Sequence, residues 1–220
     1  RRSLEQGQLR LWLGSFEPRG SSDFWREDLS VFTGSTSDLR DVNYGGDALW
    51  SVNPNVSLIF SLSYYQGTVN QYYRPLADGF VPTTDQGRAL TSVGHTSRLE
   101  ITPLTVGFLF YPAGRKAPII PYVGLGGGLY WWRWREAGDY CNGTTDPCTE
   151  FSDAYSSDGV VPGYFFVGGL DVPVRPTWSV FFEARVQRAT ATVSTDVALN
   201  GAGRLDVGGT QYEAGIAWRF

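Results

Sequence analysis

The sequence predicts an all-β fold: an eight-stranded, antiparallel, up-and-down transmembrane β-barrel with short periplasmic turns and four long extracellular loops. Three observations predict it. Eight segments alternate apolar and polar residues with the two-residue period of a strand. The connections between them alternate between short and long. The composition, with 27 Gly, 13 Phe, 12 Tyr and 8 Trp among 220 residues, is typical of a chain with many strands and turns.

The predicted strands cover residues 8–16, 42–52, 56–73, 96–111, 119–136, 163–172, 177–193 and 205–220. Each is long enough to cross a bilayer, which takes about 9 to 11 residues of tilted strand. In the fourth strand the apolar residues change face between Ile101 and Leu104. Pro103 has no N–H to donate to a neighbouring strand, and we therefore predict a β-bulge there.

The last strand shows the alternation most clearly. Its apolar face consists of Tyr212, Ala214, Ile216, Trp218 and Phe220. Its other face consists of Gln211, Glu213, Gly215, Ala217 and Arg219. A soluble protein would bury the apolar face in a core, whereas a membrane barrel turns it to lipid. Because the other strands alternate in the same way, we assign their apolar faces to lipid, those of Leu62 and Phe182 included.

The connections agree with this assignment. Short ones cover residues 53–55, 112–118 and 173–176, and long ones cover 17–41, 74–95, 137–162 and 194–204. Outer-membrane barrels place tight turns in the periplasm and long loops outside the cell, so an even number of strands puts both chain ends in the periplasm. Residues 22–32 predict a helix, because Ser22 or Asp23 can cap its first turn.

The composition also excludes several classes of protein. No run of 18 apolar residues is present, which excludes a spanning helix, and a net charge of −4 gives no electrostatic footprint for nucleic acid. We expect residues 1–220 to form a single domain. The first residues do not form a signal peptide and the chain has no Met, which fits a mature exported chain whose leader has been removed.

Polar residues on the inward faces predict a network inside the barrel. The interior of an eight-stranded barrel is only just wide enough for side chains to fill it, and buried charges must be paired. Gly124, Gly126 and Gly128 would make room for the long side chains. The alternative is an open polar pathway for ions or solutes. The predicted network consists of Arg10, Asp47, Glu183, Arg185, Gln187, Gln211, Glu213 and Arg219.

The two cysteines, Cys141 and Cys148, lie in the third long loop, and in an exported protein we expect them to form a disulfide. A metal site would need further His or Cys ligands, which this loop lacks, so we predict no metal and no cofactor. The loop is acidic, and a solvated acidic face is the ordinary explanation; bridging to lipopolysaccharide through Ca²⁺ or Mg²⁺ is the alternative.

The single histidine, His95, lies two residues before Ser97, so the two side chains share a face. A nucleophilic site would also need an acid that orients the histidine, and Glu100 points the other way unless a bulge intervenes. We therefore predict an exposed loop histidine and no catalytic residue.

The segment 121–130, which reads PYVGLGGGLY, resembles a strand of small outer-membrane barrels of the OmpA, OmpX and OmpW kind. Tyr212, Trp218 and Phe220 resemble the signal that such proteins present to the barrel-assembly machinery. The resemblance implies a location in the bacterial outer membrane. It implies conduction or binding of small hydrophobic compounds for OmpW-like proteins, and structural or adhesive roles for the OmpA and OmpX types. The His95-x-Ser97 pair resembles the nucleophile arrangement of the lipid A deacylase.

As function we predict a non-enzymatic outer-membrane protein with a structural or surface-interaction role through its extracellular loops. The alternative is an OmpW-like channel or binding site, with a pocket lined by Tyr130, Trp132, Phe165 and Val167. A lipid A-modifying enzyme or a soluble lipocalin-like carrier comes third. The expected partners are outer-membrane lipid and lipopolysaccharide, the barrel-assembly machinery, and other surface or envelope proteins. The run Trp131-Trp132-Arg133-Trp134 favours such an assembly, because tryptophan on both faces of one strand requires a cover.

Overall fold

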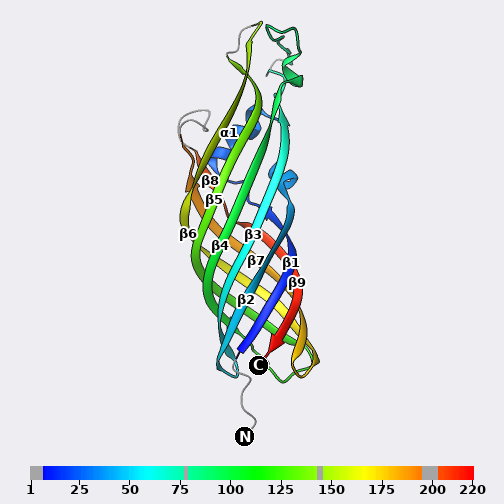
Figure 1. Ribbon diagram of the computed structural model, residues 1–220, viewed down its shortest axis with the longest axis vertical. Coiled ribbons are helices and arrows are strands. Elements are labelled where there is room, and N and C mark those ends of the chain that lie inside the picture. Colours follow the sequence, from blue (N-terminus) through cyan, green and yellow to red (C-terminus); the bar gives the residue numbers. More distant parts are fainter. Residues whose placement is uncertain (1–6, 77–78, 143–145, 195–202) are drawn as a thin grey trace.

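The computed structural model describes residues 7–76, 79–142, 146–194 and 203–220. Eight of its strands form a closed antiparallel ring, in which the last strand pairs with the first (Figure 1). The ring strands are β1 (Gly7–Pro18), β2 (Asp41–Asn53), β3 (Val56–Tyr72), β4 (Gly94–Phe110), β5 (Ile120–Asn142), β6 (Thr149–Arg175), β7 (Trp178–Thr192) and β9 (Gly209–Arg219). A short strand, β8 (Arg204–Asp206), pairs with the end of β7. The predicted eight-stranded barrel is confirmed.

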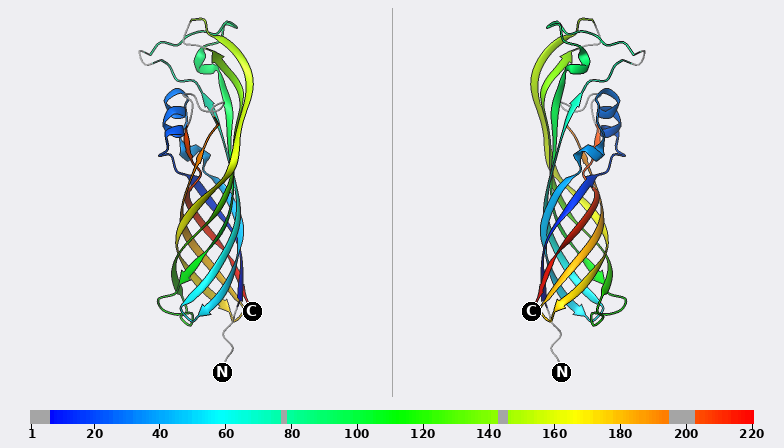
Figure 2. Two further views of the ribbon diagram at one scale, coloured as in Figure 1. Left: turned by 90° about the vertical axis from the view of Figure 1, so that its left-hand side faces the viewer. Right: turned by 90° about the vertical axis from the view of Figure 1, so that its right-hand side faces the viewer.

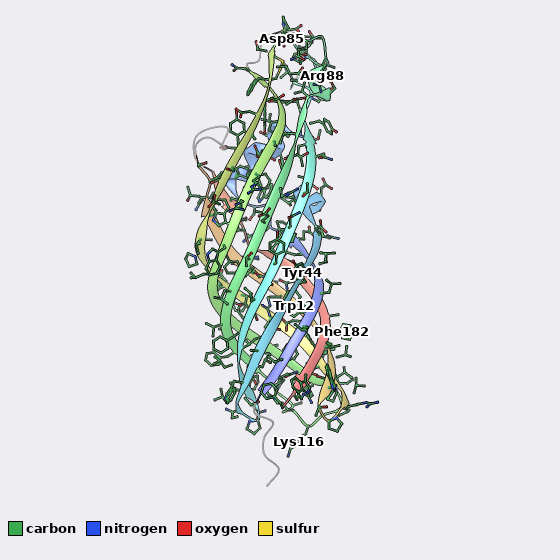
Figure 3. The ribbon with its side chains drawn as sticks, viewed as in Figure 1. Trp12, Tyr44, Asp85, Arg88, Lys116 and Phe182 are labelled. Carbon is green, nitrogen blue, oxygen red and sulfur yellow. A yellow bond between two sulfur atoms is a disulfide. The ribbon has the colours of Figure 1, made fainter. Side chains whose placement is uncertain are left out.

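The outer surface of the ring is apolar. Every ring strand exposes large hydrophobic side chains, among them Leu11, Trp50, Leu62, Phe108, Leu125, Phe166, Phe182 and Ile216. Leu62 is 54% exposed and Phe182, labelled in Figure 3, is 55% exposed. A soluble carrier would cover these two side chains with protein, so the lipocalin-like alternative is wrong. A closed ring with such an apolar belt has the surface that a lipid bilayer surrounds.

The two ends of the barrel differ. The tight turns at 54–55, 111–119 and 176–177 lie at the end where the backbones of Gly7 and Phe220 hydrogen-bond to each other. We call this the turn end and the opposite one the loop end. The first connection at the loop end contains α1 (Asp23–Val31), which confirms the predicted helix, and η1 (Thr36–Leu39); the second contains η2 (Leu90–Ser92). Among the described residues, no helix is long and apolar enough to cross a membrane.

Strands β3 to β6 continue beyond the ring at the loop end, on one side of the molecule (Figure 2). The pairing of β5 with β6 runs without a break from Ile120–Asp171 to Asn142–Thr149. The prediction of a loop over 137–162 and of a strand beginning at Gly163 was therefore wrong. Residues 150–159 are mostly exposed, because both faces of the hairpin lie outside the lipid belt. Over residues 151–154 every side chain is exposed, so the sequence there has no reason to alternate.

Strand β4 has no bulge at Pro103, which corrects the second expectation about the strands. Its register against β3 is the same at Leu104, opposite Leu62, as at Ile101, opposite Tyr65. The apolar side chains change face because their surroundings change. Leu104 points to the lipid and is 47% exposed, whereas Ile101 points inward and is buried in the barrel mouth.

Apolar side chains fill the interior at two levels. The turn-end cluster consists of Leu49, Ile59, Leu109, Tyr111, Ile120, Tyr122, Phe165 and Val167. The mouth cluster consists of Phe16, Phe24, Trp25, Leu39, Tyr65, Leu99, Ile101, Tyr130, Trp132, Trp134, Ala189, Ala191, Val193, Leu205 and Val207. The mouth cluster includes residues of α1, so the helix packs into the opening of the barrel.

Candidate functional site

Ion pairs cross the interior of the membrane-spanning part of the barrel. The guanidinium of Arg10 lies 3.6 Å from the carboxylates of both Asp171 and Glu183. Arg185 lies 2.8 Å from Glu183, and the hydroxyl of Tyr122 donates a 2.9 Å hydrogen bond to Glu183. All five side chains are buried. Arginine and carboxylate therefore neutralise each other where water is excluded, which is the condition for holding charge in a protein interior.

The network continues toward the loop end through amide side chains. Arg185 lies 3.7 Å from Glu213, which accepts a 2.8 Å hydrogen bond from Gln211. Gln187 in turn donates to Gln211. These side chains are also buried, so the interior holds a continuous set of polar contacts between β7 and β9.

One member of the network, Asp171 of β6, was missed in the sequence. Its carboxylate lies 3.6 Å from Arg10 and 3.1 Å from Arg219, and it accepts a 3.1 Å hydrogen bond from Gln8. Asp171 has the same parity in its strand as Val167, which we had placed inside. Counting two residues at a time along β6 would have found it.

Asp47, the remaining predicted member, is also inside the barrel and is 3% exposed. The indole nitrogen of Trp12 donates a 3.5 Å hydrogen bond to its carboxylate. Trp12 itself packs with Phe181 and Ala217 in a small third apolar cluster. Asp47 therefore lies at a boundary between polar and apolar interior.

The inward glycines make room for apolar side chains. A Cβ atom at Gly126 would lie 2.6 Å from the ring of Phe165, and one at Gly124 would lie 2.9 Å from Val167. The expectation that they make room for long polar side chains holds only in part, because Arg185 reaches the same region with its guanidinium 4.7 Å from the centre of the Phe165 ring.

The four residues predicted to line a hydrophobic pocket do not lie together. Tyr130 and Trp132 belong to the mouth cluster, whereas Phe165 and Val167 belong to the turn-end cluster. All four are buried by side chains of this chain.

Helix α1 covers the mouth with two aromatic side chains. The ring centroid of Trp25 lies 5.1 Å from that of Trp134, and that of Phe24 lies 5.4 Å from the same indole, both edge to face. Trp132 and Trp134 point inward and are 5% and 0% exposed, whereas Trp131 points outward and is 41% exposed. The cover that this tryptophan run requires is thus supplied by the chain itself, and the run gives no support for an assembly.

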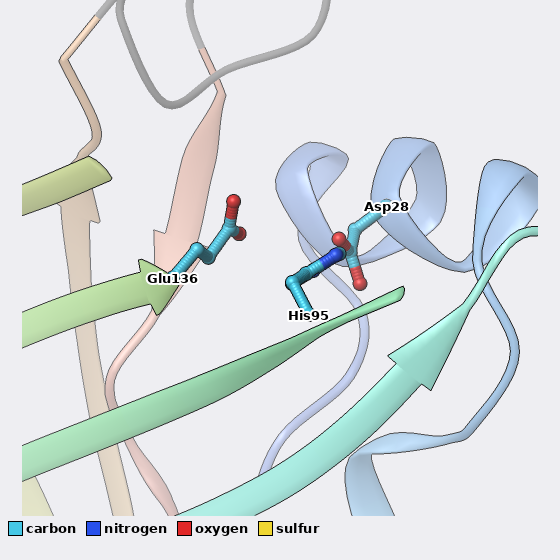
Figure 4. A group of neighbouring side chains, drawn as sticks. All are labelled: Asp28, His95 and Glu136. Carbon is cyan, nitrogen blue, oxygen red and sulfur yellow. The ribbon is translucent and has the colours of Figure 1, made fainter. Parts of the chain in front are cut away.

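A polar group lies beside this aromatic cover. Asp28 of α1, His95 of β4 and Glu136 of β5 each offer a ligand atom, and these atoms all lie within 4.8 Å of one another. Figure 4 shows His95 between the two carboxylates. The three residues are 3%, 4% and 6% exposed, in that order, so the expectation of an exposed histidine was wrong.

Burial sets the protonation of this group. Burial raises the pKa of Asp28 to about 6, although the hydrogen bond from Gln71 lowers the pKa of this carboxyl. It raises the pKa of Glu136 to about 8, although the indole of Trp134 donates to that carboxylate, and it lowers the pKa of His95 to about 4. Each shift favours the neutral form, because a charge in this pocket is poorly solvated.

The sequence reasoning missed both acids. Glu136 is paired with Ser97, and Gly138, two residues further along β5, is paired with His95. Counting the pairs from the tight turn between β4 and β5 would therefore have placed Glu136 on the same inward face as His95. Asp28 gave no such signal, because its position depends on how α1 folds over the mouth.

His95 and Ser97 share the inward face but do not form a nucleophile and base. The Ser97 hydroxyl donates a 2.7 Å hydrogen bond to Gln71, and Ser97 is 0% exposed. Glu100 points outward, as expected, and lies 3.9 Å from Arg133.

The far tip of the molecule is held by contacts between the second and third connections. The predicted disulfide between Cys141 and Cys148 is present, with 5.8 Å between the Cα atoms. Arg88 lies 3.0 Å from Asp139 and also contacts Glu150, so an arginine from the neighbouring loop (Figure 3) pairs with two of the acids of this hairpin. This pairing leaves less reason to expect a divalent cation there.

The residues predicted as an assembly signal lie on the outer surface of β9 and at its end. Tyr212 is 65% exposed, Trp218 45% and Phe220 57%. They belong to the lipid-facing belt.

Solved structures with the same fold cover nearly the whole chain. Neisserial surface protein A aligns with a TM-score of 0.52 at 11% identity, over 99% of this chain and 98% of that one. OprG from Pseudomonas aeruginosa aligns with a TM-score of 0.56 at 12% identity, over 98% and 95%. The fold is that of small outer-membrane β-barrel proteins. OmpT, an outer-membrane protease from Escherichia coli, aligns with a TM-score of 0.54 at 10% identity, over 99% and 98%.

At these identities the likeness concerns the outer-membrane barrel fold alone, and that fold includes at least one enzyme. No protein-family model matches the sequence, and no curated protein matches it.

Proposed function

We propose that this protein is a non-enzymatic barrel of the bacterial outer membrane that acts through its extracellular surface. The observation that carries the proposal is the filled interior. Ion pairs such as Arg10–Glu183 occupy the membrane-spanning part, and Trp25 of α1 occupies the mouth. A conduit would need a water-filled or apolar opening at both levels. Because the interior is filled, the loop end is the part of the barrel that would bind a partner.

Two further observations support a surface role. The sheet β3 to β6 continues far beyond the lipid belt, and its tip is fastened by a disulfide and by the pairing of Arg88 with Asp139 (Figures 1 and 2). A rigid projection of this kind keeps a binding surface away from the membrane. The rival function, an OmpW-like conduit for small hydrophobic molecules, would need α1 to leave the mouth.

Lipopolysaccharide is the partner that the outer face supports best. Arg98 of β4 and Arg135 of β5 are exposed directly beyond the outward Trp131, on the loop-end side of the belt, together with Arg133 of β5, which lies 3.9 Å from Glu100. Guanidinium groups bind phosphate in a bidentate manner, and an aromatic residue such as Trp131 marks the headgroup level. We propose that this basic rim contacts the phosphate groups of lipopolysaccharide.

We also propose that the exposed face of Tyr212, Trp218 and Phe220 is the surface that the barrel-assembly machinery recognises during insertion. The loop-end projection is the surface offered to other envelope proteins.

Recording in planar bilayers tests the filled interior. The purified protein should give no discrete openings, with or without added alkyl detergent as a hydrophobic solute. Steady openings that such a solute blocks would instead establish a conduit and overturn the proposal.

The basic rim is tested by the stabilisation that lipopolysaccharide gives over phosphatidylcholine, measured as the thermal midpoint in detergent. Replacing Arg98, Arg133 and Arg135 by Gln should abolish this difference. Lys116→Gln, at the turn end (Figure 3), is the control and should retain it. Equal stabilisation of the triple variant and the control would remove lipopolysaccharide as the partner of this rim.

A further inference from the structure

Asp28, His95 and Glu136 form a group with the features of a metal site. Its three potential ligand atoms lie within 4.8 Å of one another and come from three different elements, α1, β4 and β5. Neither ring nitrogen of His95 has a hydrogen-bond partner among the described residues, although the residue is only 4% exposed. Buried imidazole nitrogens are normally satisfied, so a missing partner is implied.

The surroundings fix the orientation of each ligand. Phe32 meets the His95 ring edge to face at 4.5 Å, and Tyr140 stacks on it at 5.0 Å. Gln71 donates a 2.6 Å hydrogen bond to one carboxylate oxygen of Asp28. Partners of this kind orient the ligands of a metal and are part of a built site.

The indole nitrogen of Trp134 does the same for Glu136, to which it donates at 2.7 Å. Ser97 supports Gln71 in turn, since its hydroxyl donates to the amide oxygen at 2.7 Å. Every ligand is therefore held by a neighbouring side chain.

We propose that Asp28, His95 and Glu136 bind one divalent transition-metal ion, with zinc as the best match. One imidazole and two carboxylates are typical zinc ligands, and three protein ligands leave a fourth position for water. Calcium and magnesium take oxygen ligands in larger numbers, and manganese binds such a donor set more weakly than zinc.

The ion would fasten α1 to the barrel wall. Asp28 lies on the helix, whereas His95 and Glu136 lie on neighbouring wall strands. Metal binding would therefore close the first loop over the mouth, in addition to the packing of Trp25. Because binding energy at such a site is also folding energy, the lid should become more stable when the ion is bound.

Calorimetric titration of the folded protein in detergent, stripped with chelator, tests the site with zinc chloride as the probe. We expect one zinc per chain, and no comparable binding of Mg²⁺ or Ca²⁺. Cobalt chloride should give visible absorption bands of a four- or five-coordinate ion, and zinc should remove them. The absence of both zinc heat and cobalt bands in the unaltered protein overturns the proposal.

Variants assign the ligands. His95→Ala and Glu136→Gln should each weaken zinc binding at least about 100-fold, more than the loss of an outer partner would cause. Glu27→Gln, on the same helix but not in the group, is the matched control and should bind as the unaltered chain does. Zinc binding that survives both ligand variants places the ion elsewhere and overturns the assignment.

Proteolysis tests the lid without a variant. Arg26 of α1 has a side chain that is 74% exposed and is open to trypsin only if the helix loosens. Zinc should slow cleavage after Arg26 several-fold in the unaltered protein and leave it unchanged in His95→Ala. A cleavage rate that zinc does not alter in the unaltered protein contradicts the fastening of α1.

Discussion

The indole of Trp25 in helix α1 meets the indole of Trp134 in strand β5 edge to face, with the ring centroids 5.1 Å apart. The contact joins the first extracellular connection to the wall of the barrel. Both side chains are at most 1% exposed, so the pair contributes fully to the apolar cover of the mouth.

Trp25→Ala should lower the free energy of unfolding by about 3–5 kcal/mol, because it leaves a cavity the size of an indole in a packed cluster. Urea unfolding in detergent, followed by the fluorescence of the remaining tryptophans, measures the change. Trp131→Ala is the control, since that side chain is 41% exposed on the lipid side and should cost much less. Equal losses in the two variants would show that α1 does not seal the mouth.

Glu183→Ala should be among the most damaging changes inside the barrel. It removes the carboxylate that pairs with Arg10 and Arg185 and leaves two guanidinium groups short of a partner, a loss of about 3–5 kcal/mol. Where the variant still folds, its conductance in planar bilayers should rise. Glu183→Gln keeps an acceptor for the Tyr122 hydroxyl and should be affected less. A stable and silent Glu183→Ala variant would mean that the network does not plug the barrel.

Gly138→Ala should destabilise the mouth by roughly 1–3 kcal/mol, as overpacking typically does. Gly138 has φ = +156° and is paired with His95, whose Cα atom would lie 2.5 Å from the added Cβ. Gly168→Ala is the control, because the nearest atom to its Cβ is 4.0 Å away. Thermal midpoints in detergent compare the two. A harmless Gly138→Ala would show that β4 and β5 are less tightly joined here.

The tip of the projection should respond to acid. The Ser152 hydroxyl and the Arg88 guanidinium both bind the Asp139 carboxylate and lower its pKa. A lowered pKa in the folded state means that the contact stabilises the tip above the ordinary aspartate pKa of about 3.9 and is lost as the pH falls below it. In an NMR titration, Arg88→Gln should raise the pKa of Asp139, and Arg40→Gln should not. An unchanged value in Arg88→Gln would exclude this ion pair.

The sequence predicted the ring well where each strand has lipid on one side and packed protein on the other. The alternation in residues 210–220, for example, placed Trp218 outside and Glu213 inside, where the structure has them. It failed where a strand leaves the belt. Residues 151–154 are all exposed, and the parity change near Pro103 reflects the bilayer boundary and not a defect in the strand.

The mouth was harder to predict, because it is built from distant parts of the chain. Trp134, His95 and Glu136 could be placed on inward faces by counting from the tight turn between β4 and β5. Their contacts with Trp25 and Asp28 could not, since no periodic pattern relates a loop helix to a strand more than one connection away.

The hydrogen-bonded seam between β1 and β9 joins the first and last strands of the ring. Until that seam closes, β1 and β9 each carry a row of unpaired backbone N–H and C=O groups, and every such group in hydrocarbon costs several kcal/mol. Insertion strand by strand would expose these rows to lipid. The strands must therefore assemble with one another at the membrane surface, or pair with the strand edge of another protein during insertion. The barrel becomes stable in the bilayer only when β1 and β9 pair.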